Sequence, residues 1–309
     1  MNWQLVLPAF LIFACTTGPA FAAAQHDSEI AALCRARSDS RGETAVVETR
    51  LATVPALVRV PVKVSQPPIL LWHGFGPPAS ERALMEALPL DDVPAIKIYL
   101  GLPQFGAREA PNGREDRVRR QNEDLGRLVF EPIVAGAARE LPSVIAALQE
   151  LQCVGTQDKV GLFGFSAGGA AALLALAEGN APIGTAVVVN ASTGLTASVQ
   201  AYERATNRKY AWSDYTRELA RRTDAVQRAA DIARNRPSLL ILHGADDAML
   251  PAENVVALRD ALAPFYRTAG SEQRLQVTLI DGLSHGWADS AHADEVRRAI
   301  ADWFGGKES

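Results

Sequence analysis

The sequence has few of the side chains that bind metals. It contains only three cysteines and five histidines in 309 residues, and they do not form the closely spaced clusters that are typical of zinc sites. A Walker-type phosphate loop and an internal repeat are also lacking. These absences predict a protein that needs no metal and no other cofactor.

Charge of one sign is not in excess. The chain carries 31 Lys and Arg residues against 35 Asp and Glu residues, which gives a net charge of −4. Domains that bind nucleic acids usually have a clear basic surplus, so we expect no nucleic-acid partner. Nothing in the composition fixes an oligomeric state.

The sequence also lacks a hydrophobic run long enough to cross a membrane comfortably. The apolar stretch 5–15 is interrupted by Pro8 and is shorter than the roughly 20 residues that a membrane helix needs. Ala20-Phe21-Ala22 follows as a cleavage pattern of small residues, which is typical of a signal peptide, although no basic side chain precedes the stretch. We therefore predict a signal peptide over residues 1–22 and a periplasmic or secreted protein, residues 23–309, with no stable membrane span.

The cysteines support two further expectations about export. The segment 12–15 partly resembles a lipobox, so lipid anchoring at Cys15 is the alternative to simple cleavage. If the signal peptide is removed, Cys34 and Cys153 remain. An even pair of cysteines in an exported protein predicts a disulfide, and two buried free thiols are the alternative.

The most informative stretch of the chain is KVGLFGFSAGG, residues 159–169. An apolar, strand-like run leads into Gly-x-Ser-x-Gly, and small residues suited to a buried helix follow. This context predicts a nucleophile elbow, in which a tight turn lifts Ser166 above a sheet. Side chains at Gly164 and Gly168 would clash in such a turn, so glycine is expected at both positions. The alternative is a structural turn in which Ser166 only caps the helix.

A serine nucleophile needs a base, and the base needs a carboxylate that orients it. The chain supplies both in the order serine, acid, histidine. The apolar run 239–242 precedes Asp246 and Asp247. We assign Asp247 as the acid, because its spacing from the preceding His-Gly pair matches a common hydrolase pattern, and Asp246 is the alternative. The run 275–280 precedes His285, which we assign as the base.

The remaining histidines fit the role of the base less well, since none follows the acid on the loop after a strand. They lie near the N-terminus, before glycines at strand ends, or at the start of a polar helix: His26, His73, His243 and His292. The two that precede glycines, His73 and His243, are interpreted as residues that shape loops.

Acyl transfer also needs backbone N–H groups that hold the oxyanion. The residue after the nucleophile, Ala167, supplies one at the start of the helix. The run 69–72 ends in His73-Gly74, which would let the next loop turn back over the sheet and direct the Phe75 N–H at the substrate. The alternative is a glycine-rich turn that binds nothing.

Together, these ordered motifs resemble the α/β-hydrolase superfamily, in particular its dienelactone hydrolase-like and serine esterase or peptidase branches. The resemblance covers roughly residues 45–304. It implies an α/β-hydrolase fold and acyl transfer to Ser166, followed by hydrolysis. Dienelactone hydrolases proper use a cysteine nucleophile, and the serine here argues against that activity.

Apolar runs alternate with helical patterns, which favours one α/β domain with a mostly parallel sheet flanked by helices. Expected strands cover 45–51, 57–64, 69–72, 95–100, 185–189, 239–242 and 275–280, with a hairpin around Pro55. Expected helices cover 80–88, 130–151, 218–234 and 291–304, and 108–127 is expected to be a charged, solvated surface. The long segment 192–236 is expected to form a small helical cap, with its aromatic residues lining an acyl pocket or simply packing.

The function that these features predict is an exported serine hydrolase that cleaves a carboxylic ester of a small-molecule acyl substrate. We prefer esters to amides, because an amine leaving group demands more protonation and the chain shows no separate domain for gripping peptides. An amidase or exopeptidase is the alternative among enzymes. A non-catalytic relative that binds a hydrophobic ligand is the alternative of another class.

Overall fold

The computed structural model describes residues 28–35 and 43–306. The expected signal peptide and Cys15 lie outside the described residues. The core is an eight-stranded sheet with the order β1-β2-β4-β3-β5-β6-β7-β8, in which β2 runs antiparallel to both of its neighbours, β1 and β4, and all other neighbouring strands pair in parallel. The strands are β1 (Ala45–Leu51), β2 (Val54–Val60), β3 (Ile69–Trp72), β4 (Lys97–Leu100), β5 (Val160–Phe165), β6 (Ile183–Val189), β7 (Ser238–Gly244) and β8 (Leu275–Ile280).

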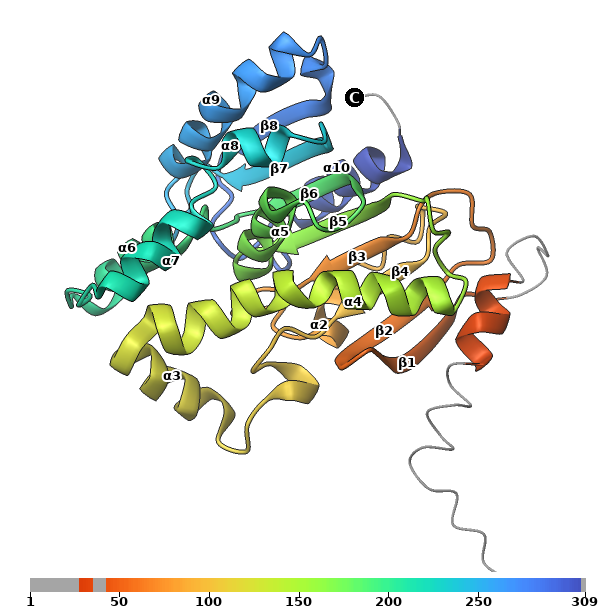
Figure 1. Cartoon of the computed structure of the whole chain (residues 1–309), viewed down its shortest axis with the longest axis horizontal. Coiled ribbons are helices and arrows are strands. Elements are labelled where there is room, and N and C mark those ends of the chain that lie inside the picture. The colour runs from red at the N-terminus through yellow and green to blue at the C-terminus, as the bar shows by residue number, and fades with distance from the viewer. Residues whose placement is uncertain (1–27, 36–42, 307–309) are drawn as a thin grey trace, which may run out of the picture.

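Helices cover both faces of this sheet, as the buried central strands require. Figure 1 shows α4, α5, α8 and α9 on one side and α2 and α10 on the other. The labelled α-helices are α2 (Glu81–Ala87), α3 (Gly113–Asp124), α4 (Gly136–Glu150), α5 (Ala167–Glu178), α6 (Leu195–Thr206), α7 (Asp214–Thr223), α8 (Ala229–Ala233), α9 (Glu253–Thr268) and α10 (Ala293–Gly305). Short 3-10 turns form η1 (Gly106–Arg108) and η3 (Glu272–Arg274), and η2 (Leu125–Ala135) is a π-helix. This is the predicted α/β architecture.

Two boundaries differ from the sequence-based expectation. The first hairpin turns at Ala52, whose φ is +53°, so Pro55 lies inside β2 rather than in the turn. The pairing of Leu51 with Val54 fixes this short connection. The helix expected at 130–151 is α4 only from Gly136 onward, and its expected start at 130–135 belongs to the π-helical η2, which contains Pro132 and follows α3. The apolar residues of η2 suit either kind of helix, so the sequence pattern did not separate the π-helix from the α-helix.

The segment expected to be one helix, 218–234, is two helices. The backbone breaks at Asp224, whose carboxylate accepts hydrogen bonds from the N–H groups of Val226 (2.9 Å) and Gln227 (3.1 Å). Aspartate often stabilises a turn in this way. The break separates α7 from α8, and α8 packs against α5.

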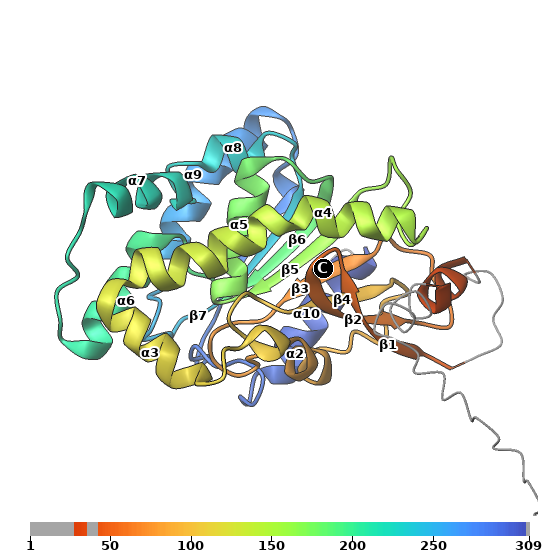
Figure 2. The same cartoon turned by 60° about the horizontal axis from the view of Figure 1, so that its bottom comes forward.

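The helices α6 and α7 of the segment 192–236 gather with α3 and η2 at one end of the molecule (Figure 2). Three tyrosine hydroxyls join these parts: Tyr202 donates to Asn122, Tyr210 to Asp124 and Tyr215 to Glu131. Each hydroxyl thus bonds to a residue of α3 or η2.

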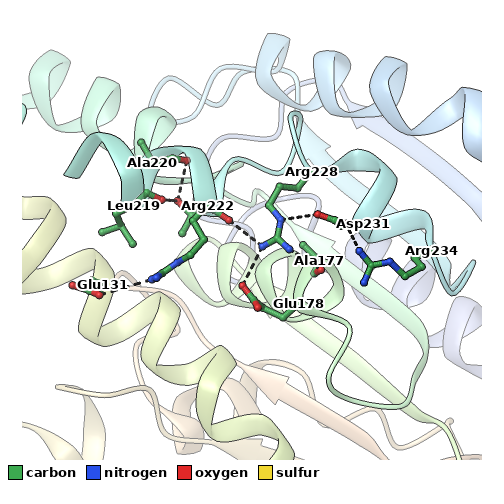
Figure 3. Close-up of polar contacts among 10 residues, drawn as sticks. Glu131, Ala177, Glu178, Leu219, Ala220, Arg222, Arg228, Asp231 and Arg234 are labelled. Atoms are coloured by element: carbon green, nitrogen blue, oxygen red, sulfur yellow. Dashed lines mark hydrogen bonds and ion pairs between the residues drawn. The ribbon is translucent and has the colours of Figure 1, made fainter. Parts of the chain in front are cut away.

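Arg228 ties the end of α5 to this layer (Figure 3). Its guanidinium group donates to the carbonyl groups of Ala177 (2.9 Å) and Arg222 (3.1 Å), which lie in the last turns of α5 and α7. It also pairs with Glu178 and Asp231. The carbonyl groups at the end of a helix have no partner within the helix, so one planar side chain with five donors satisfies two helix ends at once.

The predicted disulfide between Cys34 and Cys153 is present, and its cysteines are 119 residues apart in the sequence. Both half-cystines are fully buried. The bond attaches the helical segment 28–35 to the chain between α4 and β5, which leads to Ser166.

Removing this disulfide should destabilise the fold. In the double variant Cys34→Ser, Cys153→Ser, the unfolded chain gains the freedom of a long open loop, and we expect the free energy of unfolding to fall by about 2–5 kcal/mol. Denaturant unfolding of oxidised wild type, reduced wild type and the double variant measures the effect. Equal denaturant midpoints for the oxidised wild type, the reduced wild type and the double variant would contradict the prediction.

Candidate active site

Ser166 lies between β5 and α5 in a strained backbone conformation, with φ +53° and ψ −112°. Close backbone contacts on both sides hold this turn. A Cβ atom at Gly164 would lie 2.2 Å from the carbonyl oxygen of Gly168, and one at Gly168 would lie 2.4 Å from the carbonyl oxygen of His73. Both positions therefore exclude any side chain, as the elbow pattern predicts.

The three residues assigned as nucleophile, base and acid form one hydrogen-bonded chain. The Ser166 hydroxyl lies 3.0 Å from Nε2 of His285, and Nδ1 of His285 lies 2.7 Å from Oδ2 of Asp247. A carboxylate only accepts hydrogen bonds, so Nδ1 carries the proton and Nε2 is free to accept the serine proton. Asp247 is 3% exposed, whereas Asp246 is exposed to solvent. The structure thus places Asp247, and not Asp246, beside His285.

The loop after β7 fixes the carboxylate of Asp247. Its Oδ1 atom accepts hydrogen bonds from the N–H groups of Met249 (2.9 Å) and Leu250 (2.8 Å), which leaves Oδ2 for His285. The buried His243 donates from Nε2 to the carbonyl oxygen of Leu250 at 2.7 Å. His243 therefore shapes the acid loop, the role that its place before a glycine suggested.

Two N–H groups near the serine have no acceptor within the described part of the chain. They belong to Phe75 and Ala167, the residues expected to form the oxyanion hole. A Cβ atom on Gly74 would lie 3.1 Å from Cβ of Ser166, so the loop before Phe75 passes directly beside the nucleophile. The Phe75 ring is 37% exposed and stacks on Phe105, with 5.2 Å between ring centroids.

His73 bonds this loop to the chain that follows β4. Its Nδ1 atom donates to the carbonyl oxygen of Gly74 (2.7 Å), and its Nε2 atom accepts from the N–H of Leu102 (3.3 Å). The ring is fully buried, and burial lowers the pKa of His73 to about 4 although the Gly74 carbonyl opposes the shift. The side chain is therefore neutral at pH 7 and acts as a scaffold.

Sequence reasoning missed one polar side chain at this site. Asn190, directly after β6, is fully buried and bonds to the loops that carry the acid and the base. It lies in no recognisable motif. The only sequence signal was a polar residue at the end of an apolar run. In residues 28–35 and 43–306, no group of three or more metal-ligating side chains is found, and no helix is long and apolar enough to cross a membrane.

A model of the prolyl oligopeptidase family, Peptidase_S9, matches residues 137–307, which is more than half of the chain. The chain belongs to the prolyl oligopeptidase family. No curated protein matches it. With the contacts among Ser166, His285 and Asp247, membership of this family makes the protein a serine hydrolase.

Solved structures share the α/β-hydrolase fold at low sequence identity. A Thermus thermophilus protein is 19% identical with a TM-score of 0.64, and the match covers 85% of this chain and 99% of that chain. The Pyrococcus horikoshii acylaminoacyl peptidase is 14% identical with a TM-score of 0.60, and the match covers 85% of this chain and 41% of that chain. The Pyrobaculum calidifontis esterase is 14% identical with a TM-score of 0.56, and the match covers 95% of each chain.

The elbow should not tolerate a methyl group. In Gly164→Ala the new Cβ atom meets the Gly168 carbonyl at 2.2 Å, so the turn must shift, and misplacement of a nucleophile by about 1 Å costs on the order of a hundredfold in rate. We expect that loss in the rate of labelling by a fluorophosphonate probe. The control is Gly305→Ala, where a Cβ atom meets nothing within 4 Å. Equal labelling of both variants would contradict the prediction.

His73 should make the fold sensitive to acid. Its folded pKa of about 4 lies below the ordinary value of 6.5, so between these values the unfolded chain binds the proton more readily. The free energy of unfolding should therefore fall as the pH drops from 6.5 to 4, by about 3 kcal/mol from this residue. Urea titrations of wild type and His73→Asn across this range measure the difference in slope. If the free energy of unfolding fell with pH equally steeply in both proteins, the acid sensitivity would belong to groups other than His73.

Proposed function

We propose that the protein hydrolyses carboxylic esters of small acyl substrates through a covalent intermediate on Ser166. The observation that carries the proposal is the unbroken chain from the Ser166 hydroxyl through His285 to the buried Asp247, at 3.0 and 2.7 Å. A hydroxyl is a weak nucleophile at neutral pH, and this arrangement is how serine hydrolases activate it.

In the first half of the reaction, Ser166 Oγ attacks the carbonyl carbon of the ester, and Nε2 of His285 takes its proton. The carbonyl electron pair moves onto oxygen, where the N–H groups of Phe75 and Ala167 stabilise the negative charge. Asp247 stabilises the protonated imidazole. When the tetrahedral intermediate collapses, His285 gives the proton to the departing alkoxide and the acyl group stays on Ser166.

In the second half, a water molecule attacks the acyl-enzyme. His285 takes a proton from the water, the same two N–H groups hold the new oxyanion, and the proton returns to Ser166 as the acid leaves. All proton transfers use the one ring nitrogen that faces the serine. The mechanism needs no metal and no cofactor.

Two comparisons bear on the preference for esters. The Pyrobaculum calidifontis esterase matches this chain over 95% of both lengths, and the Paleococcus ferrophilus monoacylglycerol lipase is covered over 98% of its length. The Pyrococcus horikoshii acylaminoacyl peptidase is covered over only 41% of its chain. Similar length therefore supports the ester hydrolases. Membership of the prolyl oligopeptidase family supports an exopeptidase or amidase, which is the second candidate.

We also propose that the protein is exported to the periplasm or secreted. The support is the signal-like segment 1–22, with Cys15 as the alternative site of a lipid anchor, together with the Cys34–Cys153 disulfide. Structural disulfides persist mainly in oxidising compartments.

A fluorophosphonate probe tests the nucleophile. We expect one adduct, on Ser166, in the purified protein and none in Ser166→Ala or His285→Ala, with intact-mass and peptide mass spectrometry as the readout. If the folded wild type takes no label, the enzyme proposal fails, and a non-catalytic protein that binds a hydrophobic ligand becomes the better reading.

A matched substrate panel then separates the two candidate activities. For one acyl group offered as a p-nitrophenyl ester and as a p-nitroanilide, we expect kcat/KM to favour the ester by more than the ratio of the uncatalysed hydrolysis rates. A set of aminoacyl anilides with free and blocked amino groups is measured beside it. Faster turnover of the anilides would assign the protein to the peptidases.

A further inference from the structure

Asn190 is the first residue after β6, between the strands that lead to the nucleophile and to the acid. It is 0% exposed, and its φ of +44° lies in the left-handed region. Asparagine adopts this conformation more readily than most residues with a side chain. The backbone turns here, and the side-chain amide of Asn190 reaches the carboxyl end of β7 and the loop after β8.

Every polar group of the Asn190 side chain has a backbone partner. Nδ2 donates to the carbonyl groups of Ser284 (3.0 Å) and His285 (2.8 Å), and Oδ1 accepts from the N–H of Gly244 (2.8 Å). The partners also fix the orientation of the amide, because two carbonyl acceptors require the NH2 group and one N–H donor requires the oxygen. One side chain thus joins the loop of the base to the strand end from which the acid loop starts.

The backbone beside Asn190 extends this frame to the nucleophile. The carbonyl of Val189 accepts the N–H of Ser166 at 3.0 Å, and the N–H of Asn190 donates to the carbonyl of Leu242 at 3.0 Å. The end of β6 is therefore bonded to the nucleophile turn, to β7 and to the histidine loop.

The backbone at Ser284 and His285 depends on this contact, although the loop is also bonded to the acid loop at Leu283. Ser166 is held by the glycine contacts of the elbow and Asp247 by two backbone N–H groups, but His285 lies on an irregular loop. In residues 28–35 and 43–306, the carbonyl groups of Ser284 and His285 accept hydrogen bonds only from Asn190. Without them, the loop can tilt and move the imidazole relative to its partners.

We propose that Asn190 is a positioning residue for the reaction, which sets the place of the His285 loop against the acid strand. It touches neither the substrate nor the reacting atoms. This inference rests on the proposed function, because the position of the imidazole matters only if His285 is the base. A catalytic group must be held within about 0.5 Å of its productive position, and the two hydrogen bonds to the loop supply that restraint.

Two variants of Asn190 separate its contacts. Asn190→Gly keeps the left-handed backbone without strain and removes all three side-chain bonds. Asn190→Asp is nearly isosteric and still accepts from Gly244, but it sets a carboxylate oxygen against the two loop carbonyl groups. We expect kcat on an activated ester to fall about 10- to 100-fold in both, with KM changed by less than about threefold because no substrate contact is lost.

A control variant removes a buried hydrogen bond elsewhere. Tyr266 is buried and donates to the carbonyl of Pro237 at 2.8 Å, at the opposite end of β7 from the site. Tyr266→Phe should lower the free energy of unfolding but leave kcat unchanged. Circular dichroism and cooperative thermal unfolding establish that each variant folds.

A second readout does not require turnover. In protein labelled with 15N-histidine, the ring shifts of His285, assigned by their loss in His285→Gln, report which nitrogen carries the proton. We expect the wild type to show the Nδ1–H form that Asp247 favours, and both Asn190 variants to show a mixture of forms. This readout still decides the role of Asn190 if the wild type hydrolyses no ester and the proposed function fails.

Three results would overturn the proposal: kcat and ring shifts unchanged in folded Asn190 variants, the same kcat loss in Tyr266→Phe, or loss of the fold in both Asn190 variants. The last result would make Asn190 a support of the sheet itself rather than of the base.

Discussion

Ser166 occupies a backbone conformation that residues with side chains rarely adopt, and its surroundings hold it there. Strain of this kind persists only where neighbouring structure determines it, at a cost of about 1–3 kcal/mol. The restraint comes from backbone contacts at Gly164 and Gly168, which bring α5 against β5 and against the end of β3. The same packing brings the loop of Phe75 beside the serine, so the nucleophile turn and this loop are fixed together.

The parallel sheet explains how distant residues meet at this turn. Ser166 and His285 are 119 positions apart in the chain, yet both follow parallel strands whose carboxyl ends share one edge of the sheet. Three buried polar side chains at that edge are paired: Asp247 with its own loop, His73 with Gly74 and Leu102, and Asn190 with the end of β7 and the histidine loop. Unpaired buried polar groups are costly, so these contacts both stabilise the edge and fix the geometry of the site.

Much of this arrangement could be predicted from the sequence, because the relevant signals are local. The apolar runs gave the strands from β3 to β8, and the ordered motifs gave Ser166, Asp247 and His285. The choice between Asp246 and Asp247 needed burial, which a pair of adjacent aspartates does not reveal. The sequence pattern did not separate η2 from α4, because the spacing of apolar residues does not distinguish a π-helix from an α-helix, and the break at Asp224 was hidden by the surrounding helix formers. Asn190 could not be found, because its role depends on two loops about 50 and 95 positions away in the chain.

The disulfide has a consequence for the connectivity of the molecule. The interval that it closes contains β1 to β4 and α2 to α4, which is half of the sheet and the loop of Phe75. A single cut of the backbone anywhere in that interval produces two fragments that stay linked through sulfur and through the strand pairing. A protein clipped there would run as one species until a reductant separated its parts.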